Sequence, residues 1–339
     1  MSDHPLLQIN DLKTHFHTQR GLVTAVDGIS LHVEEGEILG VVGESGCGKS
    51  VMSQSILRLF DEKHLVKYEG EILFQEKSLL KMSESNIRKI RGNDISIIFQ
   101  DPLSSLNPVY TIGDQIAEAF ILHQKLCKNV AYEKAIEMLR LTGIPVPEKM
   151  VHKYPHELSG GMRQRAMIAM ALACQPKLLI GDEPTTALDV TIQAQILDLI
   201  VRLNKEMKMG VIFITHDLGV VAEICTRVVV MYLGQVVEEA DIENLFSNPL
   251  HPYTRGLLKS IPKMDGDRSQ KLHVIEGTVP SLNDIPRGCR FSTRCPFADE
   301  QCRSELPELK TYQKGQKVRC WHYRGILENG EVGYVNANN

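Results

Sequence analysis

The chain has 339 residues, with 38 lysines and arginines, 42 acidic residues and a net charge of −4 at pH 7. This length allows one large domain with a smaller appendage, and the small net charge gives no overall sign of nucleic-acid binding. No apolar run approaches the roughly 18 residues of a bilayer span, and the polar start differs from a secretory signal. We therefore expect a cytosolic protein that reaches a membrane only through partners.

The first strands are predicted from short apolar segments separated by glycines. Leu22–Val26 and Ile29–Val33 lie in such a region, which extends over residues 6–39 and predicts antiparallel strands. The continuous apolar run Ile38–Val42 then predicts a buried parallel strand, and residues 51–60 predict the helix that follows it.

The middle of the chain shows helical spacing followed by two more apolar runs. Residues 112–145 have apolar side chains at helical spacing and predict a helical insertion. Lys177–Gly181 and Val211–Thr215 predict buried strands with a helix between them. After about residue 246 prolines and turn residues become frequent, so we place a domain boundary there, with one domain over 1–245 and another over 246–339.

A glycine-rich segment with the pattern G-x-x-x-x-G-K-[ST] lies between the buried strand at Ile38–Val42 and the helix predicted after it. It consists of Gly43, Glu44, Ser45, Gly46, Cys47, Gly48, Lys49 and Ser50. Its backbone N–H groups can surround a phosphate, while Lys49 is expected to span the β- and γ-phosphates and Ser50 to ligate Mg²⁺. Val51 extends this expected ATP site into the helix. The alternative, a plain glycine-rich turn, is disfavoured by this context, and we assign no chemistry to Cys47.

Polar residues also follow three further apolar runs. We expect Asp182 to reach the metal, most simply through water, and Glu183 to polarise the attacking water. His216 is placed to sense a γ-phosphate, and Gln100 to reach the metal or the water. In isolation these would be solvated turn residues, or a capping or core histidine. The phosphate loop in the same chain favours the catalytic interpretation.

The segment Leu158–Met162 combines a hydroxyl with two adjacent glycines. Ser159, Gly160 and Gly161 precede an apolar run that predicts a helix, whose N-terminus would face an anion. Alone, the segment is equally typical of a turn before an amphipathic helix.

The order of these motifs resembles that of the ATP-binding cassette (ABC) family. The resemblance covers residues 6–245, where the segment Ala187–Asp189 matches the D-loop. It implies an α/β fold with a mixed sheet core, an antiparallel β subdomain and a helical subdomain at about 101–168. It also implies a head-to-tail dimer in which each ATP meets one chain's phosphate loop and the other chain's signature, here Leu158–Met162. Asp189 would lie at this interface, and Phe16 under the adenine.

Within the family, three stretches resemble the ATPase subunits of oligopeptide and dipeptide permeases: Phe99–Pro108, Gly160–Arg165 and Asn248–Thr254. The resemblance implies an ATP-hydrolysing subunit of a peptide importer, peripheral on the cytoplasmic face of the inner membrane. Its implied partners are a second ATPase in a heterodimer, two transmembrane permease subunits and an extracytoplasmic solute-binding protein, with no nucleic acid. Apolar positions around 103–120 could dock the permeases or form the helical core. Alternatives are an importer of nickel or another small solute, and a soluble ABC protein of DNA repair or translation.

Four cysteines gather near the end of the chain, at Cys289, Cys295, Cys302 and Cys320. Four thiolates suffice for a closed metal site, although structural zinc usually uses more closely spaced pairs than these. The spacing resembles the permease subunits whose extension holds a [4Fe-4S] cluster. Zinc, and plain thiols or a disulfide, remain alternatives.

Overall fold

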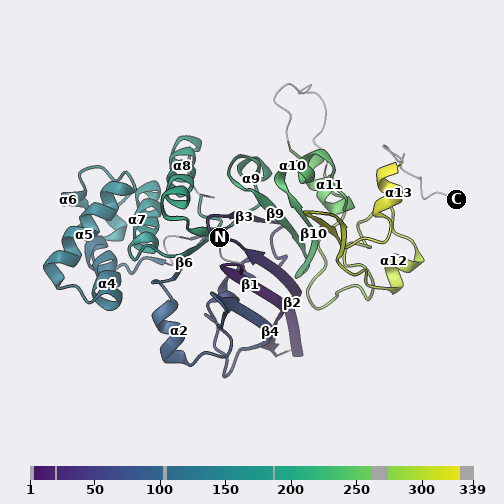
Figure 1. The fold of residues 1–339 in the computed structure, drawn as a ribbon, viewed down its shortest axis with the longest axis horizontal. Coiled ribbons are helices and arrows are strands. Elements are labelled where there is room, and N and C mark those ends of the chain that lie inside the picture. Colours follow the sequence, from purple (N-terminus) through teal and green to yellow (C-terminus); the bar gives the residue numbers. More distant parts are fainter. Residues whose placement is uncertain (1–3, 20, 102–104, 186–187, 262–273, 329–339) are drawn as a thin grey trace. The chain divides into compact units, whose positions relative to one another are not determined.

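The computed structural model describes residues 4–19, 21–101, 105–185, 188–261 and 274–328 (Figure 1). The chain forms two compact units whose segments alternate along the sequence. The first unit consists of Met1–Gln8, His32–Leu39 and Ile72–Thr215. The second consists of Ile9–Leu31, Gly40–Glu71 and His216–Asn339. In these described residues, no helix has the length and apolarity needed to cross a membrane.

Three parallel strands form the centre of the first unit. They are β6 (Ile95–Ile98), β7 (Leu178–Asp182) and β8 (Gly210–Thr215), in the order β6-β7-β8. Every residue of β7 and β8 is buried, which explains why both strands have apolar rather than alternating sequences. Because the strands are parallel, their carboxyl ends lie at one edge, where Gln100 and Glu183 follow β6 and β7.

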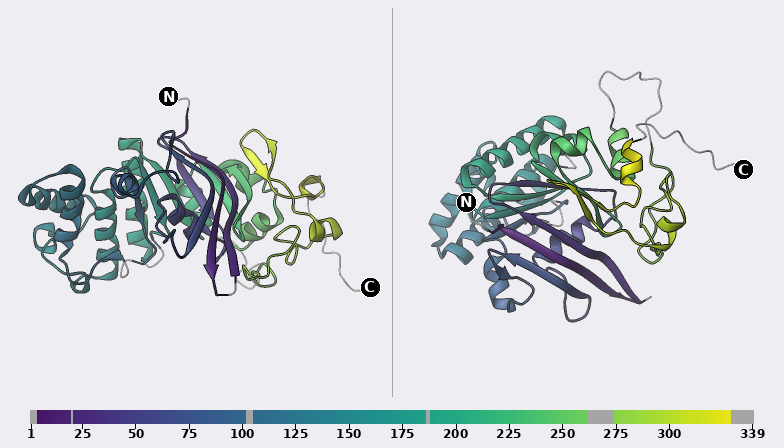
Figure 2. Two further views of the ribbon diagram at one scale, coloured as in Figure 1. Left: turned by 90° about the horizontal axis from the view of Figure 1, so that it is seen from below. Right: turned by 45° about the vertical axis from the view of Figure 1, so that its right-hand side comes forward.

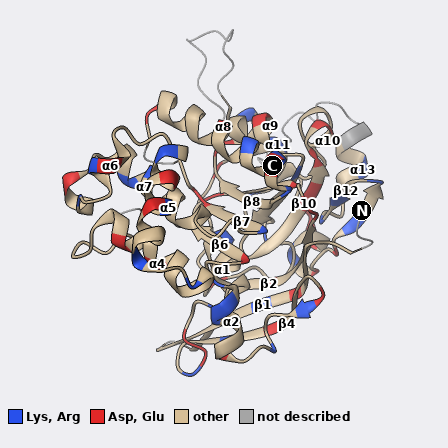
Figure 3. Cartoon of the chain, turned by 60° about the vertical axis from the view of Figure 1, so that its left-hand side comes forward, with Lys and Arg blue, Asp and Glu red and all other residues tan. Residues whose placement is uncertain are grey.

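The first unit also contains a helical subdomain. Its helices are α4 (Ile112–Gln124), α5 (Lys128–Leu141), α6 (Pro147–Met150), η1 (Pro155–Glu157) and α7 (Gly160–Leu172). The apolar residues of α4, α5 and α7 share one buried core, and the three helices lie against one another in Figure 1. Acidic and basic residues are interspersed over these helices (Figure 3). The unit is completed by β5 (Lys77–Ser78), α2 (Glu84–Ile90) and α8 (Val190–Met207).

The second unit contains long antiparallel strands and the phosphate loop. β1 (Leu7–Thr18) lies between β2 (Gly21–Val33) and β4 (Val66–Phe74), and the long β1 and β2 run side by side in Figure 2. β3 (Ile38–Val42) is buried throughout and leads into the loop, after which α1 (Lys49–Ile56) begins.

The rest of the second unit is a mixed strand and helix region. β9 (Arg227–Tyr232), β10 (Gln235–Asp241), β12 (Gln316–Val318) and β11 (Lys310–Gln313) pair antiparallel in that order. Its other helices are α9 (Leu218–Ile224), α10 (Ile242–Ser247), α11 (Pro252–Lys259), α12 (Glu300–Ser304) and α13 (Tyr323–Glu328). A short strand from near the end of the chain therefore extends the ladder begun by β9 and β10.

The structure differs from the sequence prediction at three places. The segments Leu22–Val26 and Ile29–Val33 belong to one strand, β2, which continues through Gly28 although this glycine has a positive φ of 73°. The helix predicted over 51–60 begins at Lys49 and ends at Ile56, since Arg58 has a φ of 51°. The helical insertion divides at Lys125, which closes α4 with a left-handed φ of 58°.

Candidate nucleotide site

The phosphate loop depends on glycine at both of its ends. Gly43 has a φ of 153°, and a Cβ there would lie 2.3 Å from the carbonyl oxygen of Met231. Gly48 has a φ of 96°, and a Cβ there would lie 2.5 Å from the carbonyl oxygen of Ala25. Both approaches are closer than van der Waals contact, so the backbone path of this loop requires residues without side chains. Gly46, in contrast, faces open space.

Lys49 is buried in this loop, with 5% of its surface exposed. Its Nζ donates hydrogen bonds to the carbonyl oxygens of Gly43 at 2.7 Å and Glu44 at 3.1 Å. The ammonium group is therefore held over the loop, where it can meet a phosphate without first being ordered. Ser50 and Val51 follow in the first turn of α1.

Cys47 is almost fully buried beside Lys49. Burial raises the pKa of its thiol, and this effect outweighs the opposing charge of Lys49. The side chain therefore stays a neutral thiol at physiological pH.

Gln100 and Glu183 come together in the first unit. The Gln100 side-chain amide donates to a Glu183 carboxylate oxygen at 2.9 Å. Glu183 itself has a φ of 50°, which is unusual for a residue with a side chain, and its N–H donates to the carbonyl of Ile214 in β8. Asp182, the last residue of β7, is buried just before it. A half-buried carboxylate at a strand end, oriented by an amide, suits the activation of water.

Ser159, Gly160 and Gly161 form an exposed N-terminus on α7. Ser159 is the N-cap, and its hydroxyl accepts a hydrogen bond from the Met162 N–H at 3.3 Å. That hydroxyl retains its own hydrogen as a donor. Around a Cβ built at Gly160 there is no atom within 4 Å. An open helix N-terminus with a hydroxyl donor is a favourable surface for an anion.

Residues after the signature connect α7 to the rest of the first unit. Gln164 is buried, and its side-chain amide donates to the carbonyl of Pro184, the residue after Glu183. Asp189 is the N-cap of α8 and accepts from the Ile192 N–H at 3.0 Å. The D-loop prediction also includes Ala187, which lies outside the described residues.

Two other predicted site residues, His216 and Phe16, lie in the second unit. His216 directly follows β8 and is exposed. Phe16 is half-buried and meets the ring of Phe60 edge to face, with a centroid distance of 5.0 Å. One ring contact is compatible both with a core residue and with a surface for a base.

The four cysteines lie close enough to influence one another electrostatically. Burial first, and then the neighbouring cysteines, raise the pKa of Cys295 and of Cys320 to about 12. Burial also raises the pKa of Cys289 and Cys302. At neutral pH these thiols are therefore protonated, and a cation that binds them must displace their protons.

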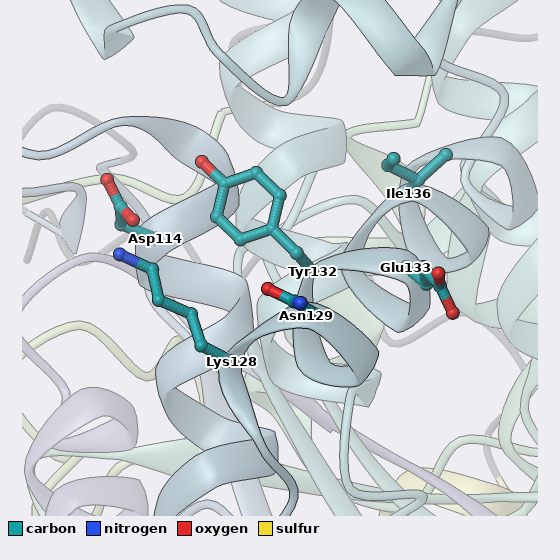
Figure 4. A pocket seen from close by; sticks show the side chains of 6 residues that line it. All are labelled: Asp114, Lys128, Asn129, Tyr132, Glu133 and Ile136. Atoms are coloured by element: carbon teal, nitrogen blue, oxygen red, sulfur yellow. The ribbon is translucent and has the colours of Figure 1, made fainter.

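A pocket of ≈ 370 Å³ lies in the helical subdomain, on α4 and α5. Its lining residues are Asp114, Lys128, Asn129, Tyr132, Glu133 and Ile136 (Figure 4). Of the apolar positions predicted to dock a partner or form the core, Ile112, Ile116 and Phe120 belong to the core, whereas Val109 is 72% exposed. Residues 102–104, which belong to the same predicted stretches, lie outside the described residues.

Comparison with known proteins decides the family of this chain. Residues 26–186 match the ABC transporter family, and residues 237–302 match the oligopeptide/dipeptide transporter C-terminal region. A probable peptide ABC transporter ATP-binding protein of Sinorhizobium fredii is 55% identical over 322 residues, covering 95% of this chain and 96% of that protein. The chain belongs to the ABC transporter family. The oligopeptide transport ATP-binding protein AppD of Bacillus subtilis is another relative of this ABC protein, 50% identical over 94% of this chain and 97% of its own length.

The fold of this ABC protein is shared with a solved cassette. The ATP-binding cassette MJ0796, in a dimeric post-hydrolysis state bound to ADP and Pi, matches with a TM-score of 0.63 and 27% identity, covering 70% of this chain and 98% of that one. The predicted α/β cassette fold and the predicted ABC-type ATPase activity are thereby confirmed.

Proposed function

We propose that this ABC ATPase supplies the energy for import of oligopeptides or dipeptides. The observation that carries the proposal is the match of residues 237–302 to the oligopeptide/dipeptide transporter C-terminal region. Relatives named for peptide and oligopeptide transport support it further, each similar over nearly the whole chain. These findings favour a peptide importer over an importer of nickel and over a soluble ABC protein of repair or translation.

Each predicted site residue has its own role in binding or hydrolysing ATP. Lys49 and the loop from Gly43 to Val51 hold the phosphates, and Phe16 supports the adenine. Ser50, Gln100 and Asp182 hold Mg²⁺, which when bound neutralises charge on the phosphates. Glu183 orients the attacking water, and His216 contacts the γ-phosphate. The hydrogen bond between Gln100 and Glu183 supports this division, because it joins two of the assigned residues.

The exposed N-terminus of α7 serves the ATP of a second cassette. Ser159, Gly160 and Gly161 donate to its γ-phosphate, and Asp189 lies at the same interface. The open space at Gly160 supports this role, since a phosphate could approach the backbone there. The partner is a related ATPase, so the two cassettes form a heterodimer with two ATP molecules between them.

The remaining partners are membrane proteins and a receptor outside the cytoplasm. Two permease subunits hold this chain peripherally at the cytoplasmic face of the inner membrane, and an extracytoplasmic binding protein delivers the cargo. The pocket on α4 and α5, together with exposed Val109 and Tyr110, offers a surface for a permease helix. In this arrangement residues 1–245 form the cassette, and residues 246–339 form the extension typical of peptide transporters.

The Glu183→Gln variant tests the catalytic assignment in the assembled transporter. Loss of the carboxylate should lower ATP turnover by about 10² or more, while ATP binding persists. Glu206→Gln, which changes an exposed glutamate of α8, is the matched control and should keep wild-type turnover. Because the partner cassette could also hydrolyse ATP, the measurement should be repeated with its corresponding glutamate replaced. Wild-type turnover in that doubly altered complex would contradict the role of Glu183.

The four cysteines hold a [4Fe-4S] cluster. A four-thiolate zinc site with bonds of about 2.3 Å would bring its sulfurs to about 3.8 Å from one another. Over the part of the chain that the structure describes, the one set of three potential ligand atoms within 4.8 Å of one another consists of Asp299, Cys302 and His322. The cysteine sulfurs are thus spread more widely than in a zinc tetrahedron, which favours a larger cluster.

Two substitutions distinguish a cluster from a mixed-ligand zinc ion. Anaerobically purified protein should be brown and contain iron, and Cys289→Ser should remove both the colour and the iron. His322→Ala should leave them in place. Colourless protein whose stoichiometric zinc is lost with His322→Ala but kept with Cys289→Ser would overturn the cluster assignment.

A further inference from the structure

The phosphate loop makes an ion pair with the C-terminal extension. The two Nη atoms of Arg294 lie 2.6 Å and 3.0 Å from the two carboxylate oxygens of Glu44. The arginine side chain is only 3% exposed and the glutamate side chain 30%. This bidentate, largely buried geometry is the strongest form of a carboxylate–guanidinium ion pair.

Arg294 is itself held in place by its surroundings. Its Nε donates to the carbonyl of Glu276 at 3.0 Å, and Nη2 donates to the carbonyl of Ile275 at 3.2 Å. The guanidinium also lies 6.0 Å from the ring centre of Phe291. With its donors engaged and its position fixed, the arginine presents a rigid fork to Glu44.

A second residue fixes the backbone of Glu44. The Glu44 N–H donates to the phenol oxygen of Tyr253 at 2.8 Å. Tyr253, from α11, is fully buried and packs against Tyr232 and Phe291, with ring centroids 4.8 Å and 5.4 Å away. Glu44 is therefore held by its side chain and by its main chain, and its N–H is not one of those offered to a phosphate.

These contacts bear directly on the orientation of Lys49. The two carbonyl groups that receive the Lys49 ammonium belong to Gly43 and Glu44, the residues at the fixed end of the loop. We propose that Arg294 and Tyr253 are positioning residues for ATP, which act through Glu44 on the phosphate loop and on Lys49. Arg294 has a second effect, since it neutralises a carboxylate in a loop that must receive a triphosphate.

The proposal predicts a specific pattern of ATP affinity in the full-length chain. Arg294→Met keeps the length of the side chain but leaves Glu44 charged and unpaired, so the Kd for a fluorescent ATP analogue should rise about 10-fold. Glu44→Gln added to Arg294→Met should restore most of that affinity, because the repelling carboxylate is gone. Tyr253→Phe removes only the acceptor for the Glu44 N–H and should raise the Kd by about threefold.

The turnover number separates positioning from catalysis. In the assembled transporter, Arg294→Met should raise the KM for ATP while kcat at saturating ATP stays within about twofold of wild type. Arg294→Lys keeps the charge but loses the fork, so its KM should lie between those of the wild type and Arg294→Met.

Arg227→Met is the matched control for loss of a buried arginine. Arg227 pairs with Glu239 across β9 and β10, with side-chain exposures of 11% and 5%. It should lower thermal stability without changing the Kd for ATP. Wild-type ATP affinity in both Arg294→Met and Tyr253→Phe would overturn the proposal. So would a failure of Glu44→Gln to restore affinity to Arg294→Met. If Arg294→Met does not fold, Tyr253→Phe and Arg294→Lys carry the same test.

Discussion

The phosphate loop and the signature segment both offer glycine backbone to a nucleotide, but their surroundings are opposite. A Cβ at Gly43 would lie 2.3 Å from a main-chain oxygen of the same chain, whereas a Cβ at Gly160 would meet no atom within 4 Å. Residues from far along the sequence fix the loop at Glu44. The comparison indicates that contacts within this chain fix the phosphate loop, whereas the backbone at Gly160 is open, as its proposed contact with the ATP of a second cassette requires.

The same substitution at the two glycines tests this contrast most strongly. Gly43→Ala should lower ATP affinity of the full-length chain by about 10² or more, since it combines a positive φ with a steric clash. Gly160→Ala should leave this affinity unchanged and reduce only the ATPase activity of the assembled transporter. Equilibrium binding of a fluorescent ATP analogue measures the first effect, and phosphate release measures the second. An equal loss of ATP affinity in Gly43→Ala and Gly160→Ala would contradict the proposed difference between the two glycine segments.

Ser159→Ala tests the hydroxyl group at the exposed N-terminus of α7. The ATPase activity of the assembled complex should fall about 10-fold, which is the loss of one hydrogen bond to a charged group. Melting of the isolated chain should show a cost of about 1 kcal/mol, because the N-cap of α7 is also lost. Ser159→Thr keeps both the hydroxyl and the cap and is the control. An ATPase rate in Ser159→Ala equal to that of Ser159→Thr would argue against a role for the hydroxyl.

Acid should lower the stability of the region that holds the phosphate loop, because His251 contacts Tyr253 there. Burial lowers the pKa of His251 from 6.5 to about 3 in the folded chain, and its Nδ1 accepts from the Tyr253 N–H. Between these two pKa values, His251 binds a proton in the unfolded chain but not in the folded chain. The contribution of His251 to the free energy of unfolding is therefore complete above pH 6.5 and is lost as the pH falls towards 3. His251→Asn keeps the acceptor but does not titrate. Thermal unfolding of this variant should thus depend less steeply on pH below 6.5 than that of the wild type, by up to about 1.4 kcal/mol per pH unit. Parallel pH profiles for the two proteins would exclude His251 as the cause.

Cys47→Ala should give the smallest change. The thiol is buried with a raised pKa and serves mainly to fill space beside Lys49. We expect kcat and KM for ATP to stay within about twofold of wild type in steady-state assays. Thiol-reactive reagents should inactivate the wild type and Cys47→Ala equally slowly. Protection by Cys47→Ala would show instead that this thiol is reachable and reactive.

The buried parallel strands and the phosphate loop could be predicted because their signals are local. β3 has the predicted bounds Ile38–Val42, and β7 and β8 differ from prediction by one residue at their ends. Continuous apolar runs are typical of strands that are covered on both faces. Glycines followed by Lys49 and Ser50 define the loop by residue type alone.

Contacts between distant residues could not be predicted in the same way. In the sequence, Tyr253 was only a member of the stretch Asn248–Thr254, and Arg294 is only the residue before Cys295. No spacing rule connects either of them to Glu44. The strand Gln316–Val318 is too short and too polar to give a periodic signal, and only its pairing with β10 defines it. The hydrogen bond from Gln100 to Glu183 also joins residues far apart in the sequence, which follow β6 and β7.

The pairing of β12 with β10 also bears on how the chain folds as it is made. β10 is followed by a long stretch of sequence before β12 is synthesised, so the edge of β10 that pairs with β12 stays unpaired until then. β12 then covers this edge, and the outermost strand becomes β11, whose four residues are exposed and polar and begin with Lys310. Such a strand discourages pairing with another molecule. We therefore expect the pairing of β12 with β10 to lower the tendency of the new chain to aggregate, before any ATP is bound.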